Sequence, residues 1–346
     1  MSRRRGPHGS AIHRGHGAMS EHSEILARLF APVEGGMARM RRVLEEQLHE
    51  SSDAVRDMTD HVGRFRGKQL RAALVLLCGE ASGNTTDEHA KVAAIVEMIH
   101  LATLVHDDIL DGAEVRRRMA CVNQRWNNQV AVLLGDFLYA RAFGLSTTLS
   151  SGLCSRLLSE TTSKLCVGEI EQSTRRYDFE LSQADYERIA GAKTASLYSA
   201  ACELGARYPG GNERVGELMR CFGWDLGLAF QIIDDVLDLT ETTEQLGKSA
   251  GTDVEDGKVT LPVLFVYRSA DEGTRAAIRD VYTAAGIEDR ARKLAEVCDL
   301  GPGLRAAMRR AKDLIAACRE RIVSLEESPA RTALLEITEF ITERRL

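Results

Sequence analysis

Apolar residues recur at steps of three and four along nearly the whole chain after residue 21. The spacing is clearest in residues 25–48, 92–105 and 218–239. Such steps place apolar side chains on one face of an α-helix. Strict two-residue alternation, which is typical of half-buried strands, is not sustained over any long stretch. The pattern therefore predicts about a dozen helices, no convincing strand and an all-α fold.

Glycine and polar clusters interrupt this pattern, but no linker or internal repeat divides the chain. We therefore expect a single all-α domain over residues 21–346. Residues 1–20 consist largely of Arg, His and Gly with almost no apolar side chain, so we expect a disordered tail there. The tail has no apolar region of the kind that a secretory signal peptide needs.

Composition narrows the class of protein. The 346 residues are 44% hydrophobic and 28% charged, which is ordinary for a globular protein. The net charge of −6 gives no basic field, so nucleic acid is not an expected partner. The longest apolar stretch, residues 72–78, is far shorter than a membrane span, so we expect no transmembrane segment. Eight scattered cysteines without a CxxC pair favour reduced thiols and a cytoplasmic location.

Two acidic pentapeptides with the same spacing end two of the apolar-periodic helices. They are residues 107–111 (DDILD) and residues 234–238 (DDVLD). Like charges four residues apart on a helix cost about 0.2–0.5 kcal/mol, and acids at a helix C-terminus cost about 0.3–1 kcal/mol more. A divalent cation would relieve both penalties, and oxygen ligands favour Mg²⁺ or Mn²⁺.

Two simpler interpretations of the acidic clusters are disfavoured. An acidic, solvated helix end is common for a single cluster, but two copies with identical spacing behind apolar helices argue against it. A calcium EF-hand is excluded because Ile109 and Arg118 stand where that loop needs acids. We therefore interpret the two clusters as a metal site.

Mg²⁺ held by carboxylates usually also binds substrate phosphates. Phosphate groups in turn are bound by Lys and Arg side chains. Basic residues follow the glycine-rich breaks and the acidic clusters; they are Lys68, Arg71, Arg116, Arg117, Arg118, Lys193, Lys248 and Lys258. No P-loop motif is present in the sequence. His100 precedes Asp107 by about two helical turns and so lies on the same side of the helix.

These motifs, in this order, resemble the trans-isoprenyl diphosphate synthase (polyprenyl synthetase) family, and its medium- and long-chain members most. The matching segments are RGKQLR (66–71), EMIHLATLVHDDILD (97–111), VRRR (115–118), AVLLGDFLYARAF (131–143), GEIEQ (168–172), KTASL (193–197), GLAFQIIDDVLDL (227–239) and GKSAGTDVEDGKVTLP (247–262). The resemblance implies an all-α isoprenoid synthase fold, a homodimer, and two Asp-rich motifs that face each other across a central cavity.

The resemblance also implies roles for individual residues. The implied metal ligands are Asp107, Asp108, Asp111, Asp234, Asp235 and Asp238. The implied contacts to an allylic diphosphate are Arg116, Lys193 and Lys248, with Lys258 as a further candidate. The implied contacts to isopentenyl diphosphate are Lys68, Arg71, His100 and Arg117. Thr194 and Gln231 are implied to line the reacting centre.

Two motifs depart from the family pattern. Gln69 and Ala72 lie in the segment that usually reads GGKxxRP, and Arg118, Ala120 and Cys121 lie in the segment that usually reads RRGxPT. The charged positions are kept in both segments. The missing Gly and Pro predict a different loop geometry at the site for isopentenyl diphosphate.

The implied reaction is a 1′-4, trans condensation of isopentenyl diphosphate with an allylic diphosphate, which releases pyrophosphate. Small side chains before the first acidic cluster predict a medium- or long-chain product. They are Ala102, Thr103 and Ile99, where short-chain members carry a bulky aromatic residue. Phe143 is a candidate for the floor of the product tunnel.

Other functions stay open at this point. They are a short-chain farnesyl or geranylgeranyl diphosphate synthase, a terpene cyclase and a non-catalytic subunit. A cyclase usually carries a mixed Asn/Ser/Glu second motif, whereas this chain has three acids in residues 234–238. A non-catalytic subunit would be expected to have lost acids or lysines, and none is lost. A transient membrane contact for product release also stays open.

Overall fold

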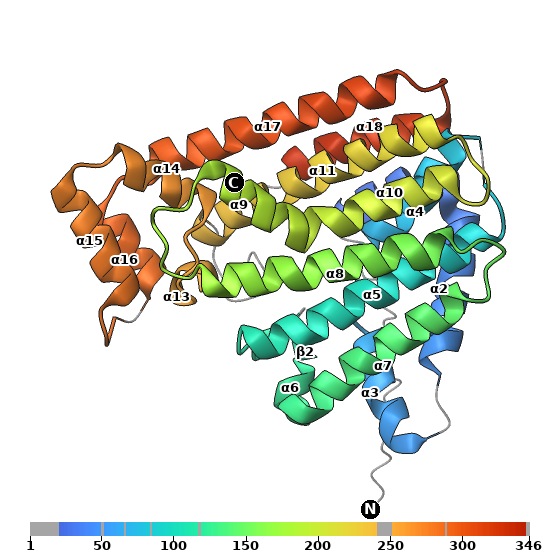
Figure 1. Ribbon diagram of the computed structural model, residues 1–346, viewed down its shortest axis with the longest axis horizontal. Coiled ribbons are helices and arrows are strands. Elements are labelled where there is room, and N and C mark those ends of the chain that lie inside the picture. Colours follow the sequence, from blue (N-terminus) through green and yellow to red (C-terminus); the bar gives the residue numbers. More distant parts are fainter. Residues whose placement is uncertain are drawn as a thin grey trace, which may run out of the picture.

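A computed structural model describes residues 21–49, 52–65, 67–83, 85–116, 119–240, 251–287 and 289–343 (Figure 1). The structure is 79% helical, which confirms the predicted all-α fold. The tail predicted for residues 1–20 lies outside the described residues.

Helices follow one another along the chain, with one short hairpin of strands among them. In chain order the elements are α1 (Glu21–Phe30), η1 (Ala31–Val33), α2 (Glu34–Leu48), α3 (Asp53–Gly63), α4 (Leu70–Ala81), α5 (Glu88–Leu110), β1 (Val115–Arg116), β2 (Met119–Ala120), α6 (Val122–Arg125), α7 (Asn128–Ser146), α8 (Leu153–Thr174), α9 (Gln183–Ala190), η2 (Gly191–Ala195), α10 (Ser196–Arg207), α11 (Glu213–Thr240), α13 (Thr252–Glu255), α14 (Leu261–Ser269), α15 (Glu272–Thr283), α16 (Arg290–Val297), α17 (Gly301–Val323) and α18 (Pro329–Thr342).

The core is built on the helices that carry or support the acidic clusters. α5 packs against α2, α4 and α7, while α11 packs against α10 and α17. α4 and α10 connect the two groups, and both are buried along almost their entire length. Buried apolar residues from α1 to α18 form one continuous hydrophobic cluster. α5 and α11 thus each bring an acidic C-terminal end to the same region of the molecule (Figure 1).

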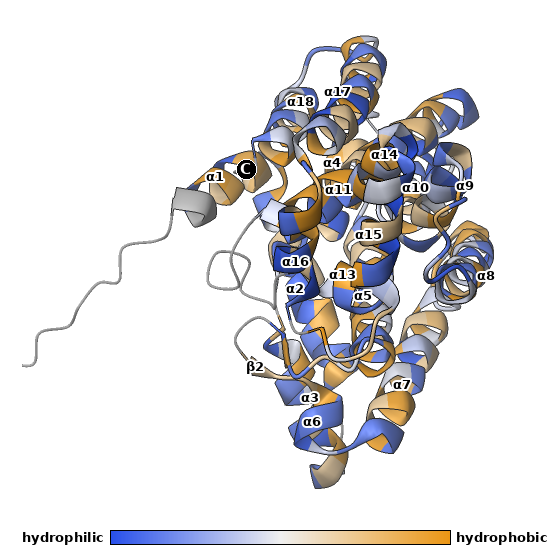
Figure 2. Cartoon of the chain, turned by 90° about the vertical axis from the view of Figure 1, so that its left-hand side faces the viewer, coloured by the Kyte–Doolittle hydropathy of each residue, from blue (hydrophilic) through white to orange (hydrophobic). Residues whose placement is uncertain are grey.

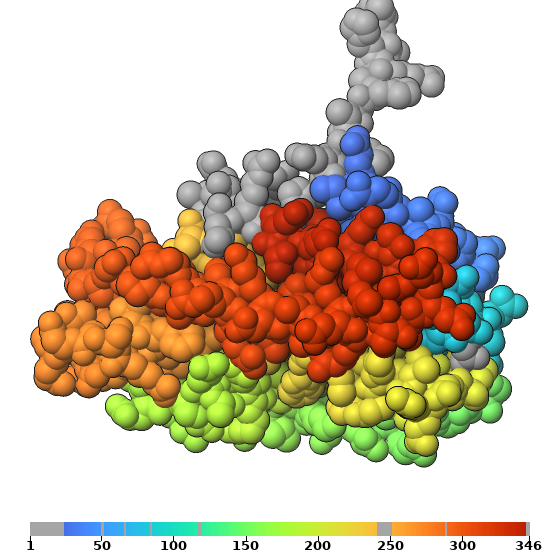
Figure 3. Space-filling model, turned by 90° about the horizontal axis from the view of Figure 1, so that it is seen from above, coloured from blue at the N-terminus to red at the C-terminus, as the bar shows by residue number. Residues whose placement is uncertain are grey.

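The C-terminal helices close one face of this core. α17 packs against α11, α14 and α18. Seen from above, α17 and α18 occupy the middle of the visible face, and residues 261–297 extend it at one end (Figure 3). Within the part of the chain that the structure describes, no helix is long and apolar enough to span a bilayer. All eight cysteines are free thiols.

The structure differs from the predicted elements in two places. The prediction of no strand was wrong, because β1 and β2 form an antiparallel hairpin after α5. Each strand has only two residues, too few to leave an alternating pattern in the sequence. The helical pattern of residues 25–48 is divided into α1, η1 and α2, with Pro32 in the first turn of η1.

Candidate active site

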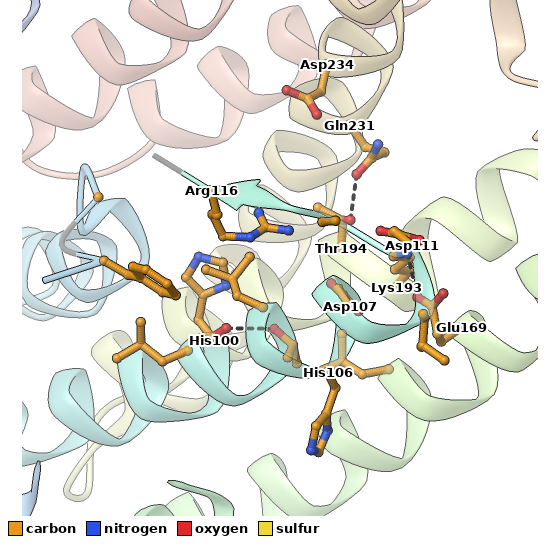
Figure 4. Close-up of a pocket in the computed structure, with 18 of the residues that line it drawn as sticks. His100, His106, Asp107, Asp111, Arg116, Glu169, Lys193, Thr194, Gln231 and Asp234 are labelled. Atoms are coloured by element: carbon orange, nitrogen blue, oxygen red, sulfur yellow. Dashed lines mark hydrogen bonds and ion pairs between the residues drawn. The ribbon is translucent and has the colours of Figure 1, made fainter. Parts of the chain in front are cut away.

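A cavity of about 1470 Å³ lies between the C-terminal ends of α5 and α11 (Figure 4). It gathers side chains from segments that are far apart in the sequence. Among the residues predicted from the sequence, those that line it are Lys68, Arg71, His100, Thr103, Asp107, Asp111, Arg116, Lys193, Thr194, Gln231, Asp234 and Lys258. Arg117 and Lys248 lie outside the described residues. The predicted meeting of acids and cations therefore occurs in one cavity.

Only one acid of each consecutive pair faces the cavity. Asp107 and Asp111 line it from α5, and Asp234 lines it from α11. Consecutive helical residues point about 100° apart, so the neighbouring acids turn into the protein. Asp108 and Asp235 are 0% and 1% exposed and do not line this cavity.

The buried acids are held by hydrogen bonds within the protein. Asp108 accepts a hydrogen bond of 2.5 Å from Nε of Arg116. Asp238, which also does not line the cavity, accepts hydrogen bonds from the Asp253 amide at 3.1 Å and the Thr252 hydroxyl at 3.3 Å. Of the six predicted metal ligands, Asp107, Asp111 and Asp234 therefore line the cavity, whereas Asp108, Asp235 and Asp238 are buried beside it, and their role at a metal stays a prediction.

Desolvation shapes the charge state of the acids in the metal-free protein. Burial raises the pKa of Asp107 to about 6, and the negative charges of Glu169 and Asp111 act in the same direction. Lys193 and Arg116 oppose that rise in pKa. Burial also raises the pKa of Asp235, against the opposing charge of Lys258. The ionised carboxylates are therefore unfavourable here even with these cations beside them.

A π-helical turn, η2, presents Lys193 and Thr194 to the cavity. Such turns are rare and occur often at functional sites. Lys193 forms an ion pair of 2.5 Å with Glu169 of α8, which also lines the cavity (Figure 4).

Two glycines allow neighbouring helices to approach this turn. A Cβ atom on Gly168 would lie 2.7 Å from the Lys193 backbone nitrogen. A Cβ atom on Gly227 would lie 2.7 Å from Cα of Ala195. The glycines of the GEIEQ and GLAFQ segments therefore have a packing role on either side of η2.

Lys68, Arg71 and His100 lie together on the cavity wall near α4. Nη1 of Arg71 donates to Nε2 of His100 over 3.1 Å, and its guanidinium lies 4.4 Å from the centre of the Tyr198 ring. Nζ of Lys68 lies 4.9 Å from the centre of the Phe340 ring.

Gln69 and Ala120, which lie in the two segments that depart from the family pattern, each accept a hydrogen bond from another part of the chain. Gln69 adopts the left-handed φ of 50° directly before α4 and accepts a hydrogen bond from Arg41 over 3.0 Å. In the hairpin, Nε2 of His61 donates to the Ala120 carbonyl over 2.8 Å, and Arg125 donates to Nδ1 of the same ring over 3.0 Å. The buried His61 thus anchors the hairpin that carries Arg116. The anchored residue, Ala120, stands where the family usually has proline.

Residues 52–299 match the family model described as Polyprenyl synthetase, which covers most of the chain. The chain belongs to the polyprenyl synthetase family. The resemblance predicted from the motifs is confirmed, and so is the class of enzyme, because this is a family of trans-prenyltransferases.

Individual relatives match nearly the full length of the chain. The all-trans-nonaprenyl-diphosphate synthase (geranyl-diphosphate specific) of Rhodobacter capsulatus is 35% identical over 317 residues, which are 91% of this chain and 97% of that protein. The octaprenyl diphosphate synthase of Escherichia coli is 30% identical over 308 residues, 89% of this chain and 95% of that protein. A crystal structure of a polyprenyl synthase from Caulobacter crescentus, complexed with calcium and isoprenyl diphosphate, has a TM-score of 0.88, 33% identity, and coverage of 93% of this chain and 98% of that one.

The four residues predicted to set the product length differ in their position relative to the cavity, and their role in chain length stays a prediction. Of the four chain-length candidates only Thr103 lines the cavity. Ala102 and Ile99 are 0% exposed and packed in the core, and Phe143 packs against the core outside the cavity lining. The apolar part of the cavity wall is formed instead by residues that include Leu104, Tyr139 and Leu165.

Sequence reasoning missed three groups at this polyprenyl synthetase site. Glu169 stands in the quoted GEIEQ segment, but nothing in the spacing marked it as the partner of Lys193. Arg176 lines the cavity and lies in a polar turn with no pattern of its own. Tyr186 is buried behind the site and donates to Asp235 over 2.5 Å. A partner that depends on tertiary contact leaves no local signal.

The raised pKa of Asp107 predicts how the stability of the metal-free enzyme depends on pH. Between the unfolded pKa of 3.8 and the folded pKa of about 6, the folded state keeps a proton that the unfolded chain has lost. The free energy of unfolding should therefore fall as the pH rises through this window. Urea unfolding in a chelating buffer measures this slope, which should be shallower for Asp107→Asn. An identical slope in wild type and variant would contradict the assignment.

Proposed function

We propose that this protein condenses isopentenyl diphosphate with an allylic diphosphate, in a 1′-4, trans linkage, to make a medium- or long-chain polyprenyl diphosphate and pyrophosphate. The observation that carries the proposal is the meeting of cavity-facing acids from α5 and α11 with cations from several other segments. The names of full-length relatives, which are heptaprenyl to nonaprenyl diphosphate synthases, support the chain-length class.

We propose Mg²⁺, or Mn²⁺ in its place, as the metal. Asp107, Asp111 and Asp234 offer hard oxygen ligands on facing walls, and burial makes the charge of Asp107 unfavourable without a cation. Among the described residues no three acid, His or Cys side chains converge closely enough to hold an ion alone. This fits Mg²⁺, which usually takes one or two carboxylates together with waters and substrate phosphates. When bound, the metal would neutralise charge on the diphosphate leaving group.

The surrounding residues divide between the two substrates. Arg116, Lys193 and Lys258 would bind the allylic diphosphate, together with Lys248. Lys68, Arg71 and His100 would hold isopentenyl diphosphate, together with Arg117. The allylic C–O bond breaks, the double bond of isopentenyl diphosphate attacks the resulting cation, and a proton is lost. The released pyrophosphate is the proposed base. The apolar wall at Leu104 and Leu165 keeps water from the cation.

We further propose that the enzyme is a cytoplasmic homodimer. The helices α7 and α8 are in contact and lie along one side of the molecule (Figure 2). Both carry exposed apolar side chains. Val132 and Leu133 of α7 are 44% and 61% exposed, and Val167 and Ile170 of α8 are 50% and 63% exposed. A second copy that covers this face would bury these side chains with two-fold symmetry.

Removing a cavity-facing acid should abolish elongation. We expect Asp107→Ala and Asp234→Ala each to lower turnover at least about 100-fold, because charge on the leaving group is no longer balanced. The assay follows incorporation of labelled isopentenyl diphosphate into farnesyl diphosphate with Mg²⁺. Asp280→Ala, at an exposed position of α15, is the control and should keep full activity. Cyclic hydrocarbons from the wild type would show a cyclase, and no turnover would show a non-catalytic subunit.

Narrowing the cavity at Thr103 should shorten the product. Thr103 lines the wall one turn before Asp107, so Thr103→Phe would place a ring in the path of the growing chain. We expect shorter prenyl chains at turnover within about tenfold of wild type, while Thr103→Ser keeps the wild-type length. Product sizing by chromatography measures this. Equal lengths in both variants would place the product elsewhere.

Charging the exposed face of α7 and α8 should separate the dimer. We expect the double variant Leu133→Asp with Val167→Asp to sediment as a monomer at micromolar concentration, where the wild type sediments as a dimer. Val323→Asp is the control, because Val323 is 56% exposed but lies on α17, away from this face. A monomeric wild type, or a variant that stays dimeric, would contradict this interface.

A further inference from the structure

We infer that Tyr186 and Asp235 are positioning residues that fix the direction of the Thr194 hydroxyl in the cavity through Gln231. The inference rests on the proposed function and deepens it. It assigns Asp235, the second acid of its cluster, to orientation of the reacting centre rather than to the metal, and it brings in a tyrosine that no motif marked.

Three hydrogen bonds form a continuous chain from the core to the cavity. The Tyr186 hydroxyl of α9 donates to Oδ2 of Asp235 over 2.5 Å. Nε2 of Gln231 donates to Oδ1 of the same carboxylate over 2.8 Å. The Thr194 hydroxyl of η2 donates to Oε1 of Gln231 over 2.7 Å (Figure 4). The chain therefore links α9, α11 and the π-helical turn.

Chemistry dictates the direction of each bond in this chain. An ionised carboxylate only accepts hydrogen bonds, so Asp235 in its ionised form forces the Gln231 amide to turn its NH₂ group inward. The amide oxygen then faces Thr194 and takes the hydroxyl hydrogen. What Thr194 offers to a group in the cavity is consequently an oxygen lone pair, not a proton. A lone pair stabilises developing positive charge, as on an allylic cation, whereas an O–H pointing the other way would oppose it.

The location of Asp235 supports orientation over metal binding. Its side chain is 1% exposed and does not line the main cavity. Both of its oxygens already accept hydrogen bonds, one from Tyr186 and one from Gln231. Gln231 and Thr194, by contrast, line the cavity directly. The carboxylate is thus one layer behind the reacting centre, and its hydrogen-bonded route to Thr194 runs through Gln231.

Replacing Asp235 by asparagine tests whether Asp235 sets the direction of the hydrogen bonds from Gln231 and Thr194. In Asp235→Asn the new amide can donate to Gln231, which lets the glutamine flip and reverse the Thr194 hydroxyl. We expect kcat for elongation of farnesyl diphosphate to fall about 30- to 100-fold. The Mg²⁺ concentration for half-maximal rate, and calorimetric affinity for farnesyl thiodiphosphate with Mg²⁺, should stay within about threefold of wild type.

A double variant should restore the direction of these hydrogen bonds while the negative charge moves from residue 235 to residue 231. In Asp235→Asn with Gln231→Glu, the asparagine amide donates to the glutamate, whose oxygens can only accept. Thr194 must then donate as in the wild type. We expect the double variant to recover kcat at least about tenfold over Asp235→Asn. A folded double variant that is no faster than Asp235→Asn, or an Asp235→Asn variant whose only defect is a higher Mg²⁺ requirement, would overturn the inference.

A matched pair of tyrosine variants tests the anchor. Tyr186→Phe removes one hydroxyl and should lower kcat about five- to tenfold with unchanged affinity for farnesyl thiodiphosphate. Tyr208→Phe is the control, because that tyrosine is also buried and donates to a carboxylate, Glu88 over 2.7 Å, but lies outside the cavity lining. Equal kcat in the two variants, with an active wild type, would overturn the inference alone. A wild type without elongation would overturn the proposed function as well.

Discussion

The structure depends on carboxylates that two apolar helices carry into a poorly solvated space. α5 and α11 are long and mostly buried, and each ends in an acidic cluster where the helix dipole also disfavours negative charge. Desolvation raises the pKa of Asp107 to about 6, which shows how unfavourable its charge is without a partner. Cations from α4, β1 and η2 line the same cavity and balance part of this negative charge.

The acids of each cluster fall into two groups, because consecutive helical residues point in different directions. Those that face the cavity are available to a metal and its diphosphate. Those that turn inward hold the surrounding structure: Asp108 binds Arg116 of the hairpin, Asp235 orients Gln231, and Asp238 accepts from the amide of Asp253 in α13. An isosteric amide at an inward position would keep the volume but replace one of the two acceptor oxygens by an NH₂ donor. The inward acids are therefore expected to matter through their neighbours.

The sequence was sufficient for the fold class, the family and most of the residues that meet in the cavity. Helical periodicity is strong along the chain, and motif spacing pointed to Asp107, Asp234, Lys193 and Arg71 without any contact information. It could not tell which acid of a pair faces inward, because that depends on how each helix is rotated against its neighbours. For the same reason it could not tell that Thr103 lines the cavity while the neighbouring Ala102 is buried.

Features made by tertiary contact were also out of reach. The π-helical turn at Lys193 arises where α8 and α11 approach closely at Gly168 and Gly227, and no local propensity predicts it. The role of Tyr186 likewise exists only through Asp235, which is 49 residues away in the sequence. The two-residue strands of the hairpin are too short to leave a pattern.

The central claim is that the cavity-facing acids bind metal, whereas the buried acids form hydrogen bonds that position neighbouring residues. Diffraction at the manganese absorption edge, from crystals grown with Mn²⁺ and farnesyl thiodiphosphate, tests it most directly. The account predicts anomalous peaks within coordination distance of Asp107, Asp111 and Asp234, and none bound by Asp108 or Asp235. Manganese coordinated by either inward acid, or no manganese between α5 and α11, would contradict it.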